Sequence, residues 1–465
     1  MNAQEFDVIV IGMGPGGEDV AERLAEAGLA VAGVESRLVG GECPYFGCVP
    51  SKMMIRAGNL LAEGRRIPGM AGRSDVEPDW APVAARIRDE ATDDWDDTVA
   101  ADRFTGKGGH LFRGTGRITG PSEVRVTPLP DGDGEGGEDG TVLRARRGIV
   151  INTGTAPAIP PIPGLAGTPL WTNREAVKAT EVPESLIVLG GGAIGVELAQ
   201  VFARFGARVT VVEALDRLVS FEEPEASDLL AKVFAGQGIV VRTGSAARQV
   251  GHDGAAFAVT LEGGDLLRAE RLLVATGRRV DLAGIGVGAV GIDEKARTIP
   301  VDDKMRAAPG VWAIGDIVGK GAFTHMSMYH AGIVVADILG TAHHGAEYHA
   351  VPRVTFTDPE IGSVGLTEAQ ARKQGIEVRV SLTQVPSSTR GWIHKAGNEG
   401  FIKLIQDARA GTLVGATSAG PMGGEVLSML TLAVHARVPV QRLREMIYAY
   451  PTFHRAIEPA LADLA

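Results

Sequence analysis

The sequence has few cysteines, no long apolar run and no excess of basic residues. Only two of its 465 residues are cysteines, too few for a framework of structural disulfides. No run of about 18 apolar residues occurs, so a membrane-spanning helix is not expected. Residues 1–7 contain neither a basic nor a long apolar stretch, so a cytoplasmic location is expected. A net charge of -11 and a pI near 5.5 argue against nucleic acid or membrane lipid as the main partner.

The composition is that of a folded protein with several domains. With 45% hydrophobic residues over 465 positions, roughly two to four domains are expected, each with its own core. Glycine is abundant, since 63 glycines exceed the usual share of about 7%. This abundance implies many tight turns and close approaches of the backbone to ligands. Small molecules or other proteins are therefore the expected partners.

Both cysteines lie in one short segment, Gly40–Lys52, as Cys43 and Cys48. The four residues between them include a glycine, so the chain can curl and bring the two sulfurs within bonding distance. The apolar periodicity of Ser51–Arg66 predicts a helix that begins just after Cys48. A helix N-terminus favours a thiolate over a thiol, which makes the pair a candidate redox centre. Two unpaired buried cysteines are the alternative.

The N-terminal residues carry a dinucleotide-binding pattern. The β-branched run Phe6–Ile11 predicts a buried parallel strand and leads directly into a glycine motif and a helix. Within the motif, Gly12 allows a tight turn, Gly14 lets the backbone approach a pyrophosphate, and Gly17 lets the helix pack on the strand. A second strand ends at Glu35, where a carboxylate can accept a hydrogen bond from a ribose hydroxyl.

The segment that follows reads as further strands. A hairpin is expected within residues 115–126, and the acidic, glycine-rich run Asp131–Gly140 predicts a solvated loop tip. The run Arg147–Gly154 predicts another buried strand. The proline-rich stretch Pro157–Pro163 after it suggests a domain boundary.

The dinucleotide-binding pattern then recurs. The strand Ser185–Leu189 leads into the motif Gly190–Gly195 and a helix, and the next strand ends at Glu213. Two copies imply two nucleotide cofactors, and the redox cysteines placed after the first copy suggest that electrons move between these cofactors. NADH is preferred over NADPH, because Glu213 would face a 2′-phosphate with a like charge.

The last third of the sequence supplies one more ligand candidate and a separate domain. A strand ends at Asp316, which is suited to bind a polyol hydroxyl, and a helix follows from about Thr324. From Val351 onward, strands and long helices alternate, which indicates an α+β domain.

Together these segments resemble the flavoprotein disulfide reductases, which include lipoamide dehydrogenase, glutathione reductase, mercuric reductase and soluble transhydrogenase. The resemblance covers nearly the whole chain, and its most specific motif is Gly40–Lys52, with an unusual Pro-Tyr-Phe between the cysteines. It implies an α/β fold with two Rossmann-like dinucleotide-binding domains and a C-terminal α+β dimerisation domain. The expected boundaries are 1–150 and 281–346 for the two parts of the FAD-binding domain, 151–280 for the NAD(P)-binding domain and 347–465 for the dimerisation domain.

The resemblance also implies roles for individual residues. Cys48 corresponds to the flavin-side, charge-transfer thiol, Cys43 to the interchange thiol that attacks a substrate, and Lys52 and Glu197 to the ion pair near flavin N5. The residues that correspond to FAD sites are Gly12, Gly14, Gly17, Glu35, Gly41, Lys52, Gly116, Thr153, Gly154, Asp316, Thr324 and His325. Those that correspond to the nicotinamide dinucleotide site are Gly190, Gly192, Gly195, Glu213 and Gly277.

The sequence departs from the family near its C-terminus. The family implies a homodimer in which a His-Pro-Thr-x-x-Glu segment of the partner subunit completes each active site. Here Tyr450 occupies the position of the acid/base His and Arg455 that of its carboxylate partner. A tyrosine with a pKa near 10 can donate a proton but is a poor general base at neutral pH. His454 is an alternative base, although its position on a helix turns it away by about 100°.

The sequence therefore predicts an FAD-dependent NAD(P)H oxidoreductase. Electrons pass from NADH to the flavin, and then to a Cys43–Cys48 disulfide or directly to a small-molecule acceptor such as a quinone. One alternative is a dihydrolipoyl dehydrogenase-like disulfide reductase with a relocated base. The other is a redox-sensing flavoprotein with little turnover. No metal site is expected, and the additional C-terminal cysteines of mercuric reductase are absent.

Overall fold

The computed structural model describes residues 3–129 and 140–464 and divides into two compact units. The first unit comprises Met1–Pro50, Ala85–Pro157 and Arg278–Glu347. The second comprises Ser51–Ala84, Ala158–Gly277 and Tyr348–Ala465. Most of the run expected to form a solvated loop, residues 131–140, lies outside the described residues.

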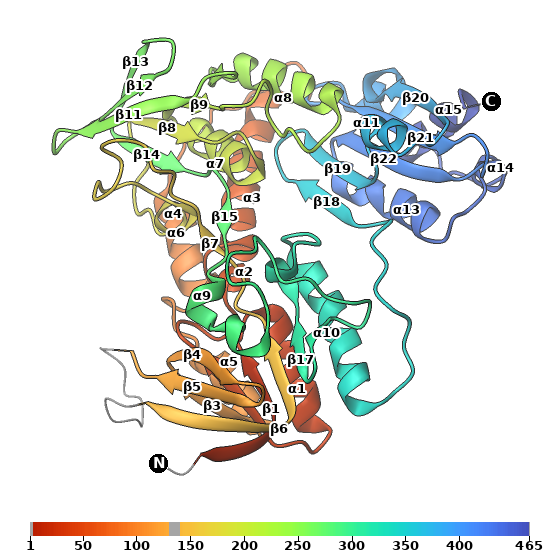
Figure 1. The fold of residues 1–465 in the computed structure, drawn as a ribbon. Coiled ribbons are helices and arrows are strands. Elements are labelled where there is room, and N and C mark those ends of the chain that lie inside the picture. Colours follow the sequence, from red (N-terminus) through yellow and green to blue (C-terminus); the bar gives the residue numbers. More distant parts are fainter. Residues whose placement is uncertain (1–2, 130–139, 465) are drawn as a thin grey trace. The chain divides into compact units, whose positions relative to one another are not determined.

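The first unit is built on a mixed sheet in which eight of the described strands take part (Figure 1). These strands are β1 (Gln4–Ile11), β2 (Val31–Glu35), β3 (His110–Arg113), β4 (Thr115–Gly120), β5 (Glu123–Thr127), β6 (Thr141–Ile151), β16 (Arg306–Ala308) and β17 (Val311–Ala313). The strand order is β16-β17-β6-β1-β2-β3, and the β4–β5 hairpin pairs with β6. A short ladder joins β7 (Ala156–Pro157) to β15 (Arg278–Arg279).

The helices of this unit are α1 (Pro15–Glu26), α2 (Glu42–Tyr45), α5 (Thr98–Gly106), α9 (Leu282–Ile285) and α10 (Thr324–Leu339). A π-helical turn spans Ile87–Ala91, and 3-10 turns span Val287–Val290 and Gly315–Val318. Helix α1 packs closely against α10, where Gly16 faces Ser327 and a side chain at Gly16 would collide with the serine. Glycine at this position therefore allows the two helices to meet.

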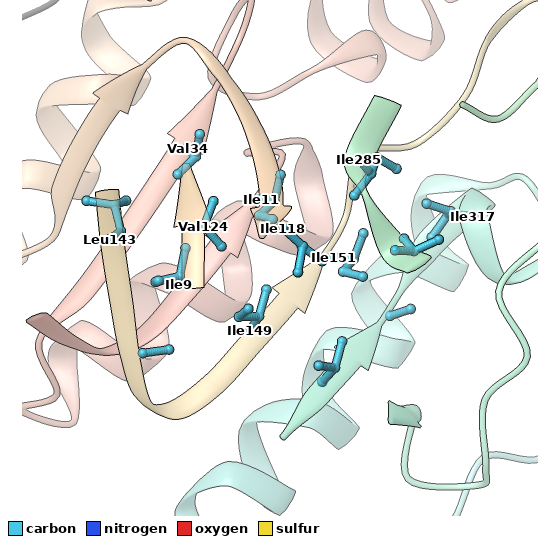
Figure 2. Packing of buried hydrophobic residues seen from close by; sticks show 14 of the residues in the cluster. Ile9, Ile11, Val34, Ile118, Val124, Leu143, Ile149, Ile151, Ile285 and Ile317 are labelled. Carbon is cyan, nitrogen blue, oxygen red and sulfur yellow. The ribbon is translucent and has the colours of Figure 1, made fainter. Parts of the chain in front are cut away.

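The core of the first unit consists of the β-branched residues that mark a buried parallel sheet. Strand β1 pairs in parallel with β2 and β6, which places Ile9 opposite Ala32 on one side and Ile149 on the other. Figure 2 shows Ile9 and Ile149 in one cluster with labelled residues of β4, β5 and α9. Burying each such side chain contributes about 1.5–3 kcal/mol to folding. The core thus fixes the carboxyl ends of β1, β2 and β6, where the first glycine motif begins.

The second unit repeats the strand–glycine–helix–strand arrangement. Its parallel sheet has the order β10-β9-β8-β14, and a separate antiparallel sheet has the order β11-β12-β13. These strands are β8 (Ser185–Leu189), β9 (Arg208–Val212), β10 (Val240–Arg242), β11 (Ala247–His252), β12 (Phe257–Leu261), β13 (Leu266–Ala269) and β14 (Arg271–Val274). The helices of this part are α3 (Cys48–Arg66), which begins within the first unit, α4 (Ala81–Arg86), α6 (Asn173–Val177), α7 (Ala193–Arg204) and α8 (Pro224–Gly236).

The C-terminal part of the second unit is an antiparallel sheet with the order β18-β19-β22-β21-β20. Its strands are β18 (Pro352–Thr355), β19 (Glu360–Gly365), β20 (Val378–Gln384), β21 (Phe401–Asp407) and β22 (Leu413–Gly420). The helices are α11 (Glu368–Lys373), α12 (Thr389–His394), α13 (Gly423–His435), α14 (Val440–Arg444) and α15 (Ile457–Ala462), and α13 packs on β19 and β22. The predicted fold class is confirmed, with two dinucleotide-binding folds and a C-terminal α+β domain.

Two local features differ from expectation. Helix α3 starts at Cys48 itself, since Pro50 is tolerated in a first turn whose N–H groups have no helical partner. The residues before it form the short helix α2, which the sequence did not predict and which carries Cys43. None of the described helices is both long enough and apolar enough to span a membrane.

Candidate active site

The two cysteines occupy helical positions at the junction of α2 and α3. The two cysteines are not joined in a disulfide, and Cys48 Sγ lies 3.4 Å from Oγ1 of Thr324, the first residue of α10. The pKa of Cys43 is raised, first because of its hydrogen bond with Cys48 and second because of burial. Cys43 therefore holds its proton more tightly than an ordinary thiol.

The cysteine segment begins directly against the first glycine motif. Gly40 donates its N–H to the carbonyl of Met13 at 2.7 Å, and a Cβ at Gly41 would lie 2.8 Å from the Cα of Gly14. Both Gly40 and Gly41 have positive φ angles, of 103° and 68°, which glycine adopts without strain. The two glycines thus bring the cysteine segment close to the backbone of the motif.

The first glycine motif has the features of a pyrophosphate cradle. Gly12 has φ 90°, and a Cβ there would collide with the carbonyl of Asn152. Helix α1 starts after Gly14 without a side-chain cap, so its first N–H groups point toward an anion site. Glu35 is buried and accepts hydrogen bonds from the N–H groups of Met13 at 2.8 Å and Arg37 at 2.7 Å. Burial raises the pKa of Glu35.

Polar groups at the ends of β6 and β17 extend this site. The Thr153 Oγ1 atom is buried without a hydrogen-bond partner within the chain. Asp316 Oδ2 accepts a hydrogen bond from Thr155 Oγ1 at 3.0 Å, and burial raises the pKa of Asp316. Asn152 and Thr155 were not identified from the sequence, because a short polar residue after a strand carries no specific signal.

Other residues matched to the FAD site lie on elements of the same unit. Gly116 lies in β4, where a Cβ would come within 3.0 Å of Val34. His325 is in the first turn of α10 and stacks on Phe323, with ring centroids 5.0 Å apart. His330, which the sequence analysis missed, is fully buried and accepts the Gly315 N–H at Nδ1 over 3.2 Å. It therefore supports the turn that carries Asp316.

The second glycine motif repeats the geometry of the first. Glu213 accepts hydrogen bonds from the N–H groups of Gly191 at 2.6 Å and Leu215 at 2.8 Å. Gly190 has φ 109°, and α7 starts after Gly192 without a side-chain cap. A Cβ at Gly195 would collide with the carbonyl of Gly190, and Gly277 has φ 127°. The Arg217 guanidinium donates hydrogen bonds to the Ser220 carbonyl and to Ser227 Oγ.

Lys52 and Glu197 form the ion pair that the family resemblance implies. Lys52 Nζ lies 2.9 Å from Glu197 Oε2, and Glu197 is only 5% exposed. The other carboxylate oxygen of Glu197 accepts the Phe356 N–H at 2.8 Å. Lys52 Nζ also lies 4.6 Å from the centroid of the Phe356 ring. Sequence reasoning missed Phe356, because tertiary folding alone brings it to the pair.

The C-terminal candidates lie in the second unit. Tyr450 is 65% exposed, and the Arg455 guanidinium lies over its ring at 5.2 Å. Arg455 also forms an ion pair with Glu458 at 2.9 Å. His454 contacts the ring of Tyr448, with centroids 5.9 Å apart. The structure thus brings Tyr450 and Arg455 together and directs His454 to another neighbour.

Two dinucleotide-binding folds and a dithiol beside the first glycine motif define a nucleotide-dependent redox enzyme. Comparison with known families is specific: residues 6–332 match the pyridine nucleotide-disulphide oxidoreductases, and residues 351–461 match the dimerisation domain of that family. The chain therefore belongs to the pyridine nucleotide-disulphide oxidoreductase family. It is an oxidoreductase that uses FAD and NAD(P)H, and its dimerisation domain implies a homodimer.

Individual relatives are similar over their whole length. The chain is 34% identical to a dihydrolipoyl dehydrogenase of Chlorobaculum tepidum, covering 99% of this chain and 97% of the relative. It is 33% identical to a mercuric reductase of Streptomyces lividans, covering 98% and 95%. Among solved structures, the HOCl-induced flavoprotein disulfide reductase RclA from Escherichia coli superposes with a TM-score of 0.84 at 25% identity, covering 98% and 99%.

The residues present fit both cofactors. At the first motif, the helix N-terminus is uncapped, the Thr153 hydroxyl is unpartnered and a Cβ added at Gly154 would meet no atom within 4 Å, which leaves donors and space for FAD. At the second motif, a side chain added at Gly192 or Gly277 would meet no atom within 4 Å, which leaves room for NAD(P)H. Among the described residues, no group of three or more metal-ligating side chains occurs.

Proposed function

We propose that the protein oxidises NADH and passes the electrons to an acceptor such as a quinone, either directly from FAD or by way of Cys43 and Cys48. Bound FAD supplies two-electron acceptance from the nicotinamide. Ordinary disulfides such as lipoamide or glutathione disulfide are poor acceptors in this proposal. The single observation that supports it is the pairing of Tyr450 with Arg455 in place of an acid/base His and its carboxylate partner.

Three groups of residues have assigned roles. Cys48 is the flavin-side thiolate and Cys43 the interchange thiol, in keeping with the raised pKa of Cys43. Lys52 and Glu197 hold a fixed charge pair at the flavin, and the Phe356 N–H orients the carboxylate. The FAD and NADH ligands are those matched at the two glycine motifs.

The C-terminal segment limits disulfide chemistry. Reduction of a disulfide releases a thiolate that must be protonated, and the same group must later accept a proton. Tyr450 can donate a proton. The group beside its ring is the Arg455 guanidinium, a cation, whereas a general base would need a carboxylate there to orient it and to stabilise its protonated form. A quinone takes electrons from reduced flavin without a thiol leaving group. The absence of the His and its carboxylate partner should therefore lower the rate of quinone reduction less than the rate of disulfide reduction. In the homodimer, this segment of the partner subunit completes each active site.

Two other functions remain as competing proposals. One is a dihydrolipoyl dehydrogenase-like reductase that uses His454 as a relocated base, which the similarity to dihydrolipoyl dehydrogenases supports. The contact of His454 with Tyr448 argues against it. The other is a redox-sensing flavoprotein with little turnover.

Steady-state NADH oxidation against a panel of quinones, disulfides and metal ions separates the three proposals. Metal ions are included because relatives are named mercuric reductases and RclA has been solved as a Cu(II) complex. Quinone turnover well above disulfide turnover is expected. Fast lipoamide turnover would favour the relocated base, and negligible turnover with every acceptor would favour the sensor.

A further inference from the structure

The Lys52–Glu197 pair is one of several side-chain contacts between α3 and α7. Both helices are labelled in Figure 1. Lys52, Asn59 and Arg66 are spaced seven residues apart and therefore share one face of α3. Glu197 and Arg204 have the same spacing on α7. Lys52 Nζ lies 2.9 Å from Glu197, and Arg204 Nη1 lies 2.5 Å from Asn59 Oδ1. The two helices thus run in register, with one polar contact at Glu197 and a second, seven residues later, at Arg204, the last residue of α7.

The helices approach closely at the second contact. A Cβ added at Gly58 would lie 3.4 Å from Cδ of Arg204 and 3.9 Å from Cα of Val201. Arg65 Nη2 also donates to the carbonyl of Arg204 at 3.1 Å. Arg204 therefore contacts α3 through both its side chain and its backbone.

Arg204 also anchors the segment between β18 and β19. Asp358 Oδ2 accepts hydrogen bonds from Arg204 Nη2 at 2.6 Å and Arg66 Nη2 at 2.7 Å. Gln200, one turn before Arg204, accepts the Asp358 N–H at 2.8 Å and donates to the Asp358 carbonyl at 2.9 Å. The backbone and the side chain of Asp358 are both held on one face of α7.

The same segment reaches the reactive end of the helices. Phe356, two residues before Asp358, donates its N–H to Glu197 at 2.8 Å and places its ring 4.6 Å from Lys52 Nζ. Arg204 is thus connected to the ion pair by two routes. One route runs through Asn59 along α3, and the other runs through Asp358 and Phe356.

Stability alone does not account for an arginine at this position. Arg204 is only 5% exposed, and its Nε atom is buried without a hydrogen-bond partner. A buried ion pair generally stabilises a fold no more than well-packed apolar residues of the same volume do. A planar guanidinium, however, can contact Asn59 and Asp358 at the same time, which no apolar side chain can do.

We propose that Arg204 is a positioning residue for the redox reaction, because its contacts with Asn59 and Asp358 set the orientation of Lys52 and Glu197. This inference rests on the proposed role of the Lys52–Glu197 pair at the flavin. Arg204 itself touches neither member of the pair, so its effect passes through the other contacts.

Anaerobic stopped-flow reduction of the flavin by NADH tests the proposal in the holoenzyme. Arg204→Met is expected to slow flavin reduction roughly 10-fold, since a misplaced group can lower a rate by up to about 10²-fold. The same variant is expected to shift the flavin midpoint potential. The KM for NADH should stay unchanged, and Asn59→Ala should have the same effect in weaker form. The control is Arg208→Met, which removes an exposed arginine 3.9 Å from Glu184.

A double-mutant cycle distinguishes positioning from general destabilisation. If Arg204 acts through the pair, Lys52→Met with Arg204→Met should be no slower than Lys52→Met alone. Two results would overturn this inference but not the proposed function. One is that the rate losses of the two single variants add in the double variant. The other is that Arg204→Met reduces the flavin at the normal rate while Lys52→Met is slow. A normal rate in Lys52→Met would overturn the proposed role of the pair and this inference with it. Should Arg204→Met yield no FAD-loaded protein, Asn59→Ala decides by the same criteria.

Discussion

The reactivity of the cysteine pair follows from where each sulfur lies in the backbone. Cys48 begins α3, and the partial positive charge of a helix N-terminus favours a thiolate. Cys43 lies in α2, where the hydrogen bond with Cys48 and burial raise its pKa, so it remains a thiol to higher pH. We therefore expect the thiolate of the reduced pair to form at Cys48.

This asymmetry predicts a spectroscopic signature. Anaerobic reduction by two electrons should produce a long-wavelength absorbance band, because the Cys48 thiolate donates charge toward the flavin. Cys48→Ser should abolish the band, and the matched change Cys43→Ser should retain it. Absorbance spectra during anaerobic titration provide the measurement. A band that survives Cys48→Ser would show that another donor is responsible.

A second prediction at the residue scale concerns the nicotinamide cofactor. NADH should give a higher kcat/KM than NADPH, because the Glu213 carboxylate would oppose a 2′-phosphate at short range. Arg217 cannot readily offset this repulsion, since its guanidinium is engaged by Ser220 and Ser227. Glu213→Gln should narrow the difference between the two cofactors in steady-state assays. Equal or better use of NADPH by the native enzyme would contradict this assignment.

His330 predicts a pH dependence of stability. Burial lowers the pKa of His330 to about 4 from 6.5, so the folded protein leaves it neutral at pH values where the unfolded chain protonates it. The free energy of unfolding therefore decreases as the pH falls from about 6.5 to about 4, by about 3 kcal/mol at most, because the unfolded chain takes up a proton that the folded protein excludes. Thermal melts of the holoenzyme should show a smaller decrease in Tm over this range for His330→Asn. An equal decrease in both proteins would mean that other groups dominate.

The sequence predicts candidate site residues where a motif fixes their spacing, and it carries no signal for contacts that folding alone brings about. Glu35 and Glu213 follow from the spacing of a strand–glycine–helix–strand pattern, and both carboxylates hold the backbone of their own motif. Phe356 contacts Glu197 across 159 positions of sequence, which no local pattern encodes. The same holds for Thr155 and Asp316, which are 161 positions apart.

At the scale of elements, the proposed function assigns the limit on disulfide chemistry to the segment from Tyr450 to Arg455. Its family counterpart carries an acid and a base, whereas here a guanidinium lies 5.2 Å from the Tyr450 ring and pairs with Glu458. A positioned acid/base contributes roughly 10²–10⁴-fold to rate. Reduction of lipoamide or glutathione disulfide should therefore be slow by about that factor relative to an enzyme with the dyad.

Restoring the dyad should raise disulfide turnover. Tyr450→His with Arg455→Glu supplies both the imidazole and the carboxylate that fixes its tautomer and orientation. Quinone turnover should change little. Because the new carboxylate would face Glu458, a companion variant with Glu458→Gln removes that repulsion, and Tyr450→His alone serves as the control. If native lipoamide turnover already equals quinone turnover, the role assigned to this segment is wrong and His454→Ala becomes the variant to examine.

Whole elements were more predictable than their ends. The β-branched strands around both glycine motifs were expected, because buried parallel strands read as continuous apolar runs. The exact start of α3 and the whole of α2 were not predicted. A four-residue helix such as α2 has no periodicity to detect. This difference matters for the site, because α2 and the first turn of α3 position the two sulfurs.

At the scale of the whole molecule, the proposed function requires the C-terminal segment of one subunit to complete the site around the cysteine pair of the other. The dimerisation domain matches residues 351–461 and includes Tyr450 and Arg455. If each site is built from both subunits, a restored dyad acts only on the cysteines of the opposite chain. Mixed dimers, purified through two different affinity tags, can separate the two arrangements.

In the first mixed dimer, one subunit carries Cys48→Ser, Tyr450→His and Arg455→Glu, and its partner is native. The functional cysteines then face the restored dyad only across the interface, so lipoamide turnover should exceed that of the native dimer. In the second, one subunit carries Cys48→Ser alone and its partner carries Tyr450→His and Arg455→Glu. There the functional cysteines and the dyad share one chain, and no gain is expected. A gain confined to the second dimer would place each complete site within a single subunit, because the two dimers contain the same substitutions and differ only in which chain carries them.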